Sequence, residues 1–261
     1  MSEKLLELID INKTFAAGTV NEAVLFRDFS IEIGKGEFVS VIGSNGSGKT
    51  TALNIISASV GADSGRVLLA GDDITALPEY KRARRIARVF QDPSLGTVGS
   101  MSICENMALA EGKGKRALLT PATDRRKVKK YAEMVSELGL GLEDKMNTPV
   151  GLLSGGQRQA LSLLMCTMNL PQLLLLDEHT AALDPRTADK VMNITEKIVR
   201  SRGITAVMVT HNLRYAVEYG DRLLMMHAGE IILDRRAQEK KNTAVEDLLG
   251  IFNSISIECG N

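Results

Sequence analysis

The sequence predicts an α/β fold with a parallel β-sheet at its core, an antiparallel β-layer and an inserted α-helical subdomain. Three apolar runs, Phe38–Ile42, Leu173–Leu176 and Ile204–Val209, do not alternate with polar residues, which is typical of parallel strands buried on both faces. Helix-like stretches separate these runs, as in proteins whose helices cover a sheet. In contrast, Lys4–Ile11 and Val24–Ile33 alternate apolar and polar residues, which predicts antiparallel strands with one solvated face.

The composition limits the classes of protein to consider. The 261 residues are 44% hydrophobic and 4% aromatic, as in an ordinary soluble α/β protein, and the 32 basic and 32 acidic side chains cancel, so no overall charge attracts nucleic acid or an anionic membrane. No apolar run approaches the roughly 20 residues that span a bilayer, and Met1–Lys4 lacks a signal-peptide core, which predicts a cytosolic protein. Cys104, Cys166 and Cys259 are odd in number and far apart, which favours reduced thiols.

The segment Gly43–Thr50 follows the first of the buried strands and precedes a helix-like run, Thr51–Ser57. Its glycines allow backbone N–H groups to turn towards an anion, and the helix N-terminus adds partial positive charge. In such a loop Lys49 contacts the outer phosphates and Thr50 binds Mg²⁺. The alternative is a glycine-rich turn without a ligand. The flanking strand and helix favour the phosphate loop.

The stretches on either side of this loop carry further signals. Phe15 follows the first strand in a polar, turn-rich neighbourhood, where its ring could stack on an adenine or form a small hydrophobic plug. Arg66–Ala70 and the turn after it predict another hairpin of the β-layer. Glu79–Arg85 predicts a short helix whose arginines form a solvated face. The strand-like Ile86–Phe90 ends at Gln91, and strand tips are where α/β sheets place ligand contacts.

Residues 92–149 predict a helical insertion, with helices around Cys104–Ala110 and Arg125–Leu138. A basic, glycine-containing link covers Gly112–Arg116, and basic residues outnumber acidic ones within Lys113–Lys130. This segment could contact lipid headgroups, but a solvated helix face is the simpler interpretation.

Two more segments place polar residues where ligands bind. Leu153–Gln157 precedes an apolar helix, so it predicts a second anion site or a helix capped by Ser154. The strand Leu173–Leu176 ends at Asp177 and Glu178. Acidic groups at a buried strand tip are costly unless they serve a cation or a reaction. Asp177 suits Mg²⁺ binding through water, and Glu178 suits polarisation of an attacking water.

The last part of the chain completes the sheet. Ala182–Pro185 starts a helix with proline in its first turn. The strand Ile204–Val209 ends at Thr210 and His211, and a histidine at this level suits a γ-phosphate. The buried side of the helix and the core methionines are expected to comprise Ala188, Val191, Met192, Thr195, Ile198, Val199, Met225 and Met226. The tail predicts one helix, about Thr243–Leu249.

In this order the motifs resemble those of the ATP-binding cassette (ABC) family, from Phe15 to about Leu233. The resemblance matches Gly43–Thr50 to the Walker A loop, Gln91 to the Q-loop, Leu153–Gln157 to the signature, Leu173–Asp177 with Glu178 to Walker B and the catalytic glutamate, Ala182–Asp184 to the D-loop, His211 to the switch histidine and Phe15 to the adenine-stacking residue.

The resemblance implies a P-loop NTPase with a RecA-like core, acting as an ATPase coupled to transmembrane transport. It implies a catalytic set of Glu178, His211, Gln91 and Lys49, and Mg²⁺ ligands Thr50, Gln91 and Asp177. The implied ATP contacts are Phe15, Gly43, Ser44, Asn45, Gly46, Ser47, Gly48, Lys49, Thr50, Thr51, Gln91, Ser154, Gly155, Gly156, Gln157 and Asp184.

The family also implies partners. Two cassettes pair head to tail around two ATP molecules, each held by the phosphate loop of one chain and the signature of the other. We expect a second ATPase subunit, forming a homodimer, integral membrane permease subunits and an extracytoplasmic solute-binding protein, with the chain at the cytoplasmic face of the membrane. The expected organisation is one domain, 1–261, in which 1–91 and 150–240 form the β-layer and core, 92–149 the helical insertion and 241–261 a short tail.

The chain departs from the family at His179, where proline commonly follows the catalytic glutamate. This histidine could tune proton transfer from the water, or it could be a loop substitution without a chemical role. Asn147–Gly151 lacks the acidic stretch of exporter cassettes, which favours an importer of a small solute. The segments Asp177–Pro185 and Met225–His227 look like a bacterial subgroup sometimes assigned to aromatic amino acids.

Two other functions compete with transport. A nucleic-acid or ribosome ATPase of this family usually has two cassettes in one chain or a long coiled coil at the insertion, and neither pattern is present. A binding module without hydrolysis is disfavoured because Glu178 and His211 are both present. The sequence therefore favours a transport ATPase without a nucleic-acid partner.

Overall fold

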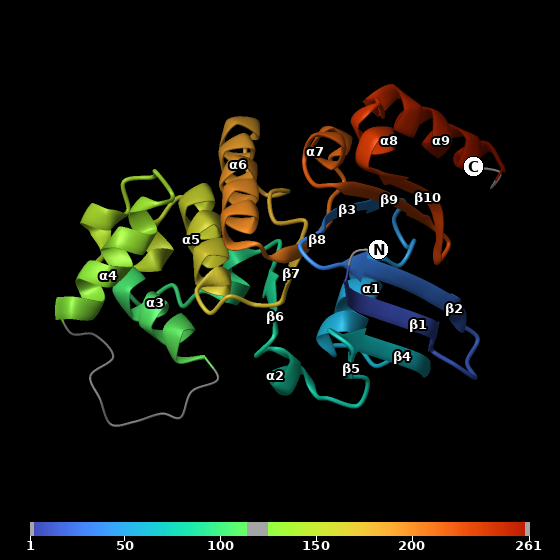
Figure 1. Cartoon of the computed structure of the whole chain (residues 1–261), viewed down its shortest axis with the longest axis horizontal. Helices are drawn as coiled ribbons and strands as arrows, with labels where there is room; N and C mark the ends of the chain where they lie inside the picture. Colours follow the sequence, from blue (N-terminus) through green and yellow to red (C-terminus); the bar gives the residue numbers. More distant parts are fainter. Residues whose placement is uncertain (1–2, 114–124, 259–261) are drawn as a thin grey trace. The chain divides into compact units, whose positions relative to one another are not determined.

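The computed structural model describes residues 3–113 and 125–258 and divides the chain into two compact units (Figure 1). The first unit contains the residues up to Ala83 and those from Thr205, and the second contains Arg84–Ile204. Part of the basic link and Cys259 lie outside the described residues. Cys104 and Cys166 are both free thiols, as expected.

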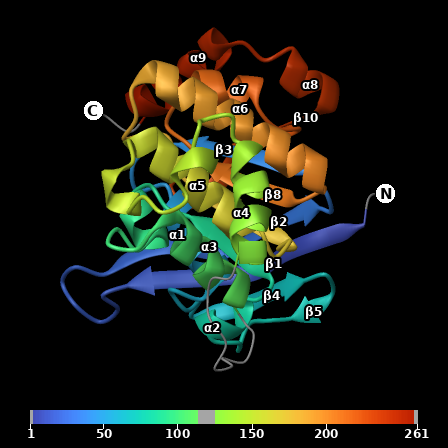
Figure 2. The same ribbon diagram turned by 90° about the vertical axis from the view of Figure 1, so that its left-hand side faces the viewer.

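The first unit contains the predicted antiparallel layer. Its strands have the order β2-β1-β4-β5, and they span Lys4–Phe15 (β1), Ala23–Gly34 (β2), Ser64–Leu69 (β4) and Asp72–Asp73 (β5). The strand β1 pairs antiparallel with both β2 and β4, and Figure 2 shows it extending across this layer. Both β1 and β2 are longer than predicted, so Phe15 ends a strand and does not lie in the loop after it. The turn-like polar residues near Phe15 hid this extension.

The first unit also holds four neighbouring strands in the order β10-β9-β3-β8. They span Phe38–Gly43 (β3), Thr205–Val209 (β8), Arg222–His227 (β9) and Glu230–Arg236 (β10). The strand β3 runs parallel to β8 and β9, while β10 returns antiparallel to β9. Every residue of β3 and β8 is buried, which confirms the prediction from their continuous apolar runs.

Helices complete this unit, namely α1 (Lys49–Ser57), α2 (Glu79–Arg82), α7 (Leu213–Glu218), α8 (Ala237–Lys241) and α9 (Val245–Glu258). The tail prediction was too short, because α8 precedes the expected helix and α9 continues past Leu249. Leu248 is fully buried in a cluster with Ile42 and Met225, and Ile251 and Phe252 pack against the same cluster. This apolar contact carries the helix through Gly250.

The prediction that the arginines of the short basic helix are solvated is wrong for Arg82. Its side chain is buried, and its guanidinium donates to the carbonyl oxygens of Ile55 and Ile56 at 2.8 and 2.9 Å and to those of Leu77 and Thr75 at 3.0 and 2.8 Å. The carbonyls at the C-terminal end of a helix lack partners within it, and a cation is favoured there. Arg82 therefore joins α2 to the end of α1.

The second unit contains two parallel strands and most of the longer helices. Its strands and helices are β6 (Ile86–Val89), α3 (Ile103–Gly112), α4 (Arg125–Ser136), α5 (Gly155–Thr167), β7 (Leu173–Asp177) and α6 (Pro185–Arg202), with short 3₁₀ turns at Pro93–Gly96, Glu143–Lys145 and Val150–Leu152. The first four residues of β7 are fully buried, as predicted. The helices α5 and α6 pack together, and the buried residues of α6 are those expected from its periodicity.

Candidate functional site

The phosphate loop connects β3 to α1 through backbone conformations that need glycine. Gly43, Gly46 and Gly48 have φ angles of 155°, 77° and 101°. A Cβ at Gly43 would lie 2.2 Å from the carbonyl oxygen of Met226, and one at Gly48 would lie 2.6 Å from the ring of Phe26. Close packing of the loop against neighbouring elements therefore excludes larger residues, which fixes its path.

Lys49 folds back over this loop. Its side chain is buried, and Nζ donates to the carbonyl oxygens of Gly43 and Ser44 at 2.9 and 2.8 Å, with Ser47 Oγ at 3.4 Å. The N-cap of α1 is Gly48, and no side chain among the described residues caps it. A buried cation beside an N-terminus of this kind is suited to binding phosphate.

His211 lies at the same edge of the first unit's parallel strands as the phosphate loop. In the parallel pair Val209 of β8 is the partner of Val41 of β3, and the N–H of Thr210 donates to the carbonyl oxygen of Val41 at 3.1 Å. His211 follows directly and is exposed, as are Asn45 and Thr50. The topology therefore brings the predicted histidine to the end of the strand beside the loop.

Phe15 also lies in the first unit, at the end of β1. Its side chain is 41% exposed, and Lys13 Nζ lies 5.4 Å from the centroid of its ring. This exposure is not that of a hydrophobic plug. An accessible aromatic face beside a cation is suited to stacking on a nucleotide base.

Gln91, Asp177 and Glu178 lie together in the second unit. The strands β6 and β7 are parallel, with Val89 the partner of Leu176, so the residues that follow them share one edge. Gln91 is exposed, whereas Asp177 and Glu178 are half-buried.

Asp177 has a partner that sequence analysis missed. Arg88 Nη2 donates to Asp177 Oδ2 at 2.5 Å, and both side chains are nearly buried, with exposed fractions of 12% and 13%. The guanidinium carbon of Arg88 also lies 5.0 Å from the centroid of the Phe90 ring. The available signal was a cationic residue in the middle of the strand-like run 86–90. A buried cation needs a carboxylate nearby.

Glu178 begins a tight loop between β7 and α6. Its φ of 47° is left-handed, and its carbonyl oxygen accepts from the N–H of Ala181 at 2.9 Å. His179, the departure from the family pattern, is 2% exposed and lies with Nε2 3.1 Å from Thr195 Oγ1 of α6. Burial lowers the pKa of His179 to about 4, so its ring is neutral at pH 7.

The segment before α5 forms a capped helix N-terminus. Ser154 Oγ accepts from the N–H of Gln157 at 3.3 Å, and Gln157 Oε1 accepts from the N–H of Ser154 at 3.1 Å. The capping prediction for Ser154 is therefore confirmed. Gly155 is exposed, while Gly156 packs on Thr187 of α6, where a Cβ would lie 2.0 Å from Thr187 Cγ2.

Asp184 starts α6 as its N-cap, accepting from the N–H of Thr187 at 3.2 Å. The hydroxyl and N–H of Thr187 lower the pKa of this carboxyl. The signature and D-loop segments thus begin two neighbouring helices of one unit.

The predicted magnesium ligands fit the preference of that ion. Thr50, Gln91 and Asp177 offer hydroxyl, amide and carboxylate oxygens, and Mg²⁺ is typically bound by one or two carboxylates together with phosphates and water. The described residues contain no group of three or more histidine, cysteine or acidic side chains that could enclose a metal by themselves. Each of the three oxygen donors is therefore of a kind that suits Mg²⁺ bound together with a nucleotide.

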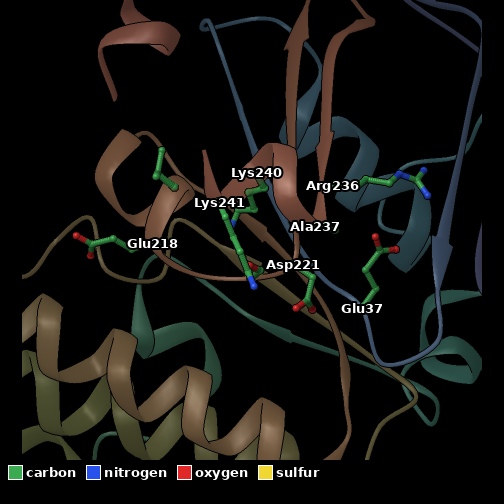
Figure 3. A pocket seen from close by; sticks show the side chains of 9 residues that line it. Glu37, Glu218, Asp221, Arg236, Ala237, Lys240 and Lys241 are labelled. Carbon is green, nitrogen blue, oxygen red and sulfur yellow. The ribbon is translucent and has the colours of Figure 1, made fainter. Parts of the chain in front are cut away.

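A separate pocket of about 590 Å³ lies in the first unit (Figure 3). Its lining consists of Glu37, Val217, Glu218, Gly220, Asp221, Arg236, Ala237, Lys240 and Lys241. Several of these charges serve the fold: Lys240 donates to the carbonyl oxygens of Tyr219 and Gly220, and Asp221 accepts from the N–H of Phe38 at 2.9 Å. The lining includes none of the described residues that the motifs assign to ATP.

Comparison with known proteins identifies the family. The model of the family described as ABC transporter matches residues 26–181, more than half of the chain. The chain belongs to the ABC transporter family. It is 48% identical over 248 residues to a tyrosine transport ATP-binding protein of Clostridioides difficile (strain R20291), covering 95% of this chain and 98% of that one. It is 34% identical to a spermidine/putrescine import ATP-binding protein, PotA, of C. difficile (strain 630), covering 99% and 72%.

Solved ABC cassettes have the same fold. The ADP conformation of the cassette MJ1267 is similar with a TM-score of 0.79 at 26% identity, covering 99% of both chains. The dimeric post-hydrolysis state of the cassette MJ0796, bound to ADP and Pi, has a TM-score of 0.75 at 28% identity, covering 90% of this chain and 99% of that one.

These comparisons confirm the P-loop NTPase fold and the ATPase function expected from the motifs. The chain is the ATP-binding and ATP-hydrolysing subunit of an ABC transporter. Within its described residues, no helix has the length and apolar character needed to cross a bilayer.

Proposed function

We propose that this ABC subunit powers the import of an aromatic amino acid, with tyrosine as the first candidate. The observation that carries the proposal is the 48% identity to the tyrosine transport ATP-binding protein, which extends over 98% of that protein. The relatives named for spermidine and putrescine import are less similar, at 31–34% identity.

The motif residues are proposed to divide the work of hydrolysis. Lys49 and the loop amides bind the phosphates, and the exposed ring of Phe15 stacks on adenine. Thr50, Gln91 and Asp177 hold Mg²⁺, which neutralises charge on the phosphate oxygens when it is bound. Glu178 accepts a proton from the attacking water.

Water oxygen bonds to the γ-phosphorus, the bond to the bridging oxygen breaks, and ADP leaves. We assign contacts with the γ-phosphate to His211 and Gln91. The exposure of His211 at a strand end supports this role.

The remaining motif residues are proposed to contact ATP only when two cassettes assemble. We propose that Ser154–Gln157 and Asp184 of one cassette act on the nucleotide of a second copy, since the dimeric cassette MJ0796 shows that this fold pairs. The exposure of Gly155 leaves the start of α5 accessible to a partner. We further propose membrane permease subunits and an extracytoplasmic solute-binding protein as partners, and a position at the cytoplasmic face of the membrane.

A permease contact is supported by an apolar surface in the second unit. We call Leu95, Val98 and Met101 the 95–101 patch; these side chains are 69%, 41% and 36% exposed. Asn106 holds the segment in shape, accepting from the N–H of Val98 at 2.8 Å and donating to the carbonyl oxygens of Val98 and Met101 at 3.0 and 3.2 Å. A fixed apolar patch of this kind is typical of an interaction surface.

Uptake by a strain that lacks this chain tests the proposal. We expect loss of radiolabelled tyrosine uptake, restoration by the intact gene and no restoration by Glu178→Gln. Unchanged tyrosine uptake together with lost spermidine uptake would show that the transported solute is spermidine and not tyrosine, and the transport function would stand. Unchanged uptake of both would contradict the assignment to these solutes.

A further inference from the structure

The backbone at Glu178 is held in a conformation that a residue with a side chain seldom adopts. Its φ is 47°, in the left-handed region, where the Cβ of an L-residue crowds the following carbonyl. Conformations of this kind persist only where the surroundings hold them. Contacts of the loop that starts at Glu178 therefore have to hold it in place.

Two backbone hydrogen bonds shape this loop, from the N–H of Ala181 to Glu178 and from the N–H of Leu183 to Thr180. Both bonds stay within the loop, so they cannot fix it to the rest of the unit. His179 does so, because its ring is 2% exposed and contacts α6 through Thr195. The ring thus reaches from the residue after Glu178 to a helix of the same unit.

The direction of the hydrogen bond follows from the geometry at Thr195. The Oγ1 of Thr195 lies 2.8 Å from the carbonyl oxygen of Val191, which can only accept, so the single hydroxyl proton is donated there. At 3.1 Å from Thr195 Oγ1, Nε2 of His179 must then be the donor. The imidazole therefore carries its proton on Nε2, and the chain of donors runs from His179 through Thr195 to the backbone of α6.

We propose that His179 is a positioning residue for Glu178, and that the His179–Thr195 hydrogen bond keeps the loop in the conformation that directs the Glu178 carboxylate. This inference rests on the proposed role of Glu178 as the base. His179 contacts α6 and acts only through the backbone that it shares with Glu178. The helix α6, which contains Thr195, also begins at Asp184, and its Thr187 packs against Gly156 at the start of α5. The Glu178 loop, Asp184 and Gly156 are therefore all positioned by α6.

Substitutions on both sides of the hydrogen bond test the proposal. Thr195→Val keeps the volume and removes the acceptor, and His179→Leu removes the donor. We expect each to lower kcat about 10-fold with KM for ATP changed less than about twofold, because misplacement of a catalytic group lowers the rate of the chemical step. His179→Gln retains an N–H donor and should recover most of the lost kcat. The double variant should be no slower than either single variant, because both remove one interaction.

Thr167→Val is the matched control for a loss of packing or stability. Thr167 is a fully buried threonine of α5 whose hydroxyl accepts from Arg202 Nη1 at 2.9 Å and also donates to a carbonyl oxygen of its own helix. It should lower the melting temperature as much as Thr195→Val while leaving kcat unchanged. Equal loss of kcat in the control would overturn the proposal, as would parent kcat in both Thr195→Val and His179→Leu.

Glu178→Gln separates the proposal from the function on which it rests. If this variant hydrolyses ATP at the parent rate, the role of Glu178 fails. If it is inactive while the variants at His179 and Thr195 remain folded and fully active, the role of Glu178 stands and the positioning role is wrong. Hydrogen exchange of the Ala181 amide gives a readout without turnover, because release of the loop in Thr195→Val should speed it.

Discussion

Substitutions of Lys49 and of Glu178 should impair different steps, ATP binding and ATP hydrolysis respectively. Glu178→Gln keeps the phosphate loop intact and removes the base, so we expect unchanged ATP affinity and at least a 100-fold loss of hydrolysis. Lys49→Ala removes a buried ammonium that contacts the loop at 2.8–2.9 Å, so ATP binding itself should weaken. Nucleotide titration and phosphate release measure the two effects. Equal ATP affinity in the two variants would contradict this division of roles.

We expect Arg88 to compete with Mg²⁺ for the carboxylate of Asp177. In Arg88→Met the Asp177 carboxylate loses its 2.5 Å partner, so we expect the Mg²⁺ concentration for half-maximal ATP binding to fall severalfold. The free energy of unfolding should fall by about 3 kcal/mol, because breaking a nearly buried ion pair leaves one charge uncompensated.

Arg85→Met is the matched control for that substitution. Arg85 Nε donates to the neutral amide oxygen of Gln172 at 2.8 Å, so the change removes a cation near Arg88 and leaves the Arg88–Asp177 ion pair in place. We expect the Mg²⁺ dependence of this control to match the parent. An unchanged Mg²⁺ dependence in Arg88→Met would show that Arg88 does not compete with the ion.

The residues at the strand ends and Arg88 show which features of a site can be predicted from the sequence and which cannot. The positions of Glu178, Asp177 and His211 at strand ends follow from continuous apolar runs that end in polar residues. The pairing of Arg88 with Asp177 depends on the register of two strands 89 positions apart, with Arg88 opposite Leu175. Local patterns contain no information on that register. The same limit hid the contact of His179 with Thr195.

The two glycines at the start of α5 should differ in their tolerance of a methyl group. A Cβ at Gly156 would lie 2.0 Å from Thr187 Cγ2, so Gly156→Ala must push α5 from α6, with a loss of about 1–3 kcal/mol in stability. At Gly155 the nearest atom to a Cβ is the end of the Leu183 side chain at 3.2 Å, which can shift. Gly155→Ala should therefore unfold at the parent denaturant concentration or slightly above it.

Glu111 should make the contact between α3 and α4 sensitive to acid. Hydrogen bonds from Lys130 Nζ and Tyr131 Oη, at 2.5 and 2.7 Å, lower the pKa of this carboxyl to about 2. A folded pKa below the usual 4.5 means that the ionised form stabilises the fold above pH 4.5, and this stabilisation is lost as the pH falls towards 2.

Chemical unfolding of the parent and of Glu111→Gln measures this effect. The difference in unfolding free energy between them should be about 2 kcal/mol smaller at pH 3 than at pH 6. Glu105→Gln on the same helix should show a smaller change of the same sign, because hydrogen bonds with Ser102 also lower the pKa of Glu105 but within an exposed capping box. A difference for Glu111→Gln that does not change with pH would contradict the assigned pKa.

Helices could be predicted from the sequence where a regular apolar face indicated them. The buried face of α6 was predicted residue for residue, since Asp184 and Pro185 fix its start and its periodicity is regular. The helix α9 was predicted too short because the packing of Ile251 and Phe252, which continues it, depends on long-range contacts. Arg82 was misassigned for a related reason, since two of its four carbonyl partners, Ile55 and Ile56, belong to α1 and lie 26–27 positions earlier in the chain.

The 95–101 patch offers the sharpest test of how this ATPase joins its transporter. We expect Leu95→Glu with Val98→Glu to preserve folding and ATP hydrolysis of the isolated chain, because both side chains are already exposed and the Asn106 bonds to this segment use backbone groups. Assembly with the permease should be lost, since two carboxylates would be desolvated against an apolar partner surface. Pull-down of tagged permease from membranes measures it directly.

Leu170→Glu with Val20→Glu is the matched control, because it adds the same charge at exposed apolar residues, 63% and 101% accessible, outside the patch. It should assemble and transport like the parent. If the control also lost the permease, the effect would come from charge and not from position. If the patch variant assembled and transported normally, the permease would have to bind elsewhere, and misfolding of the variant would show that these side chains support the packing of the unit.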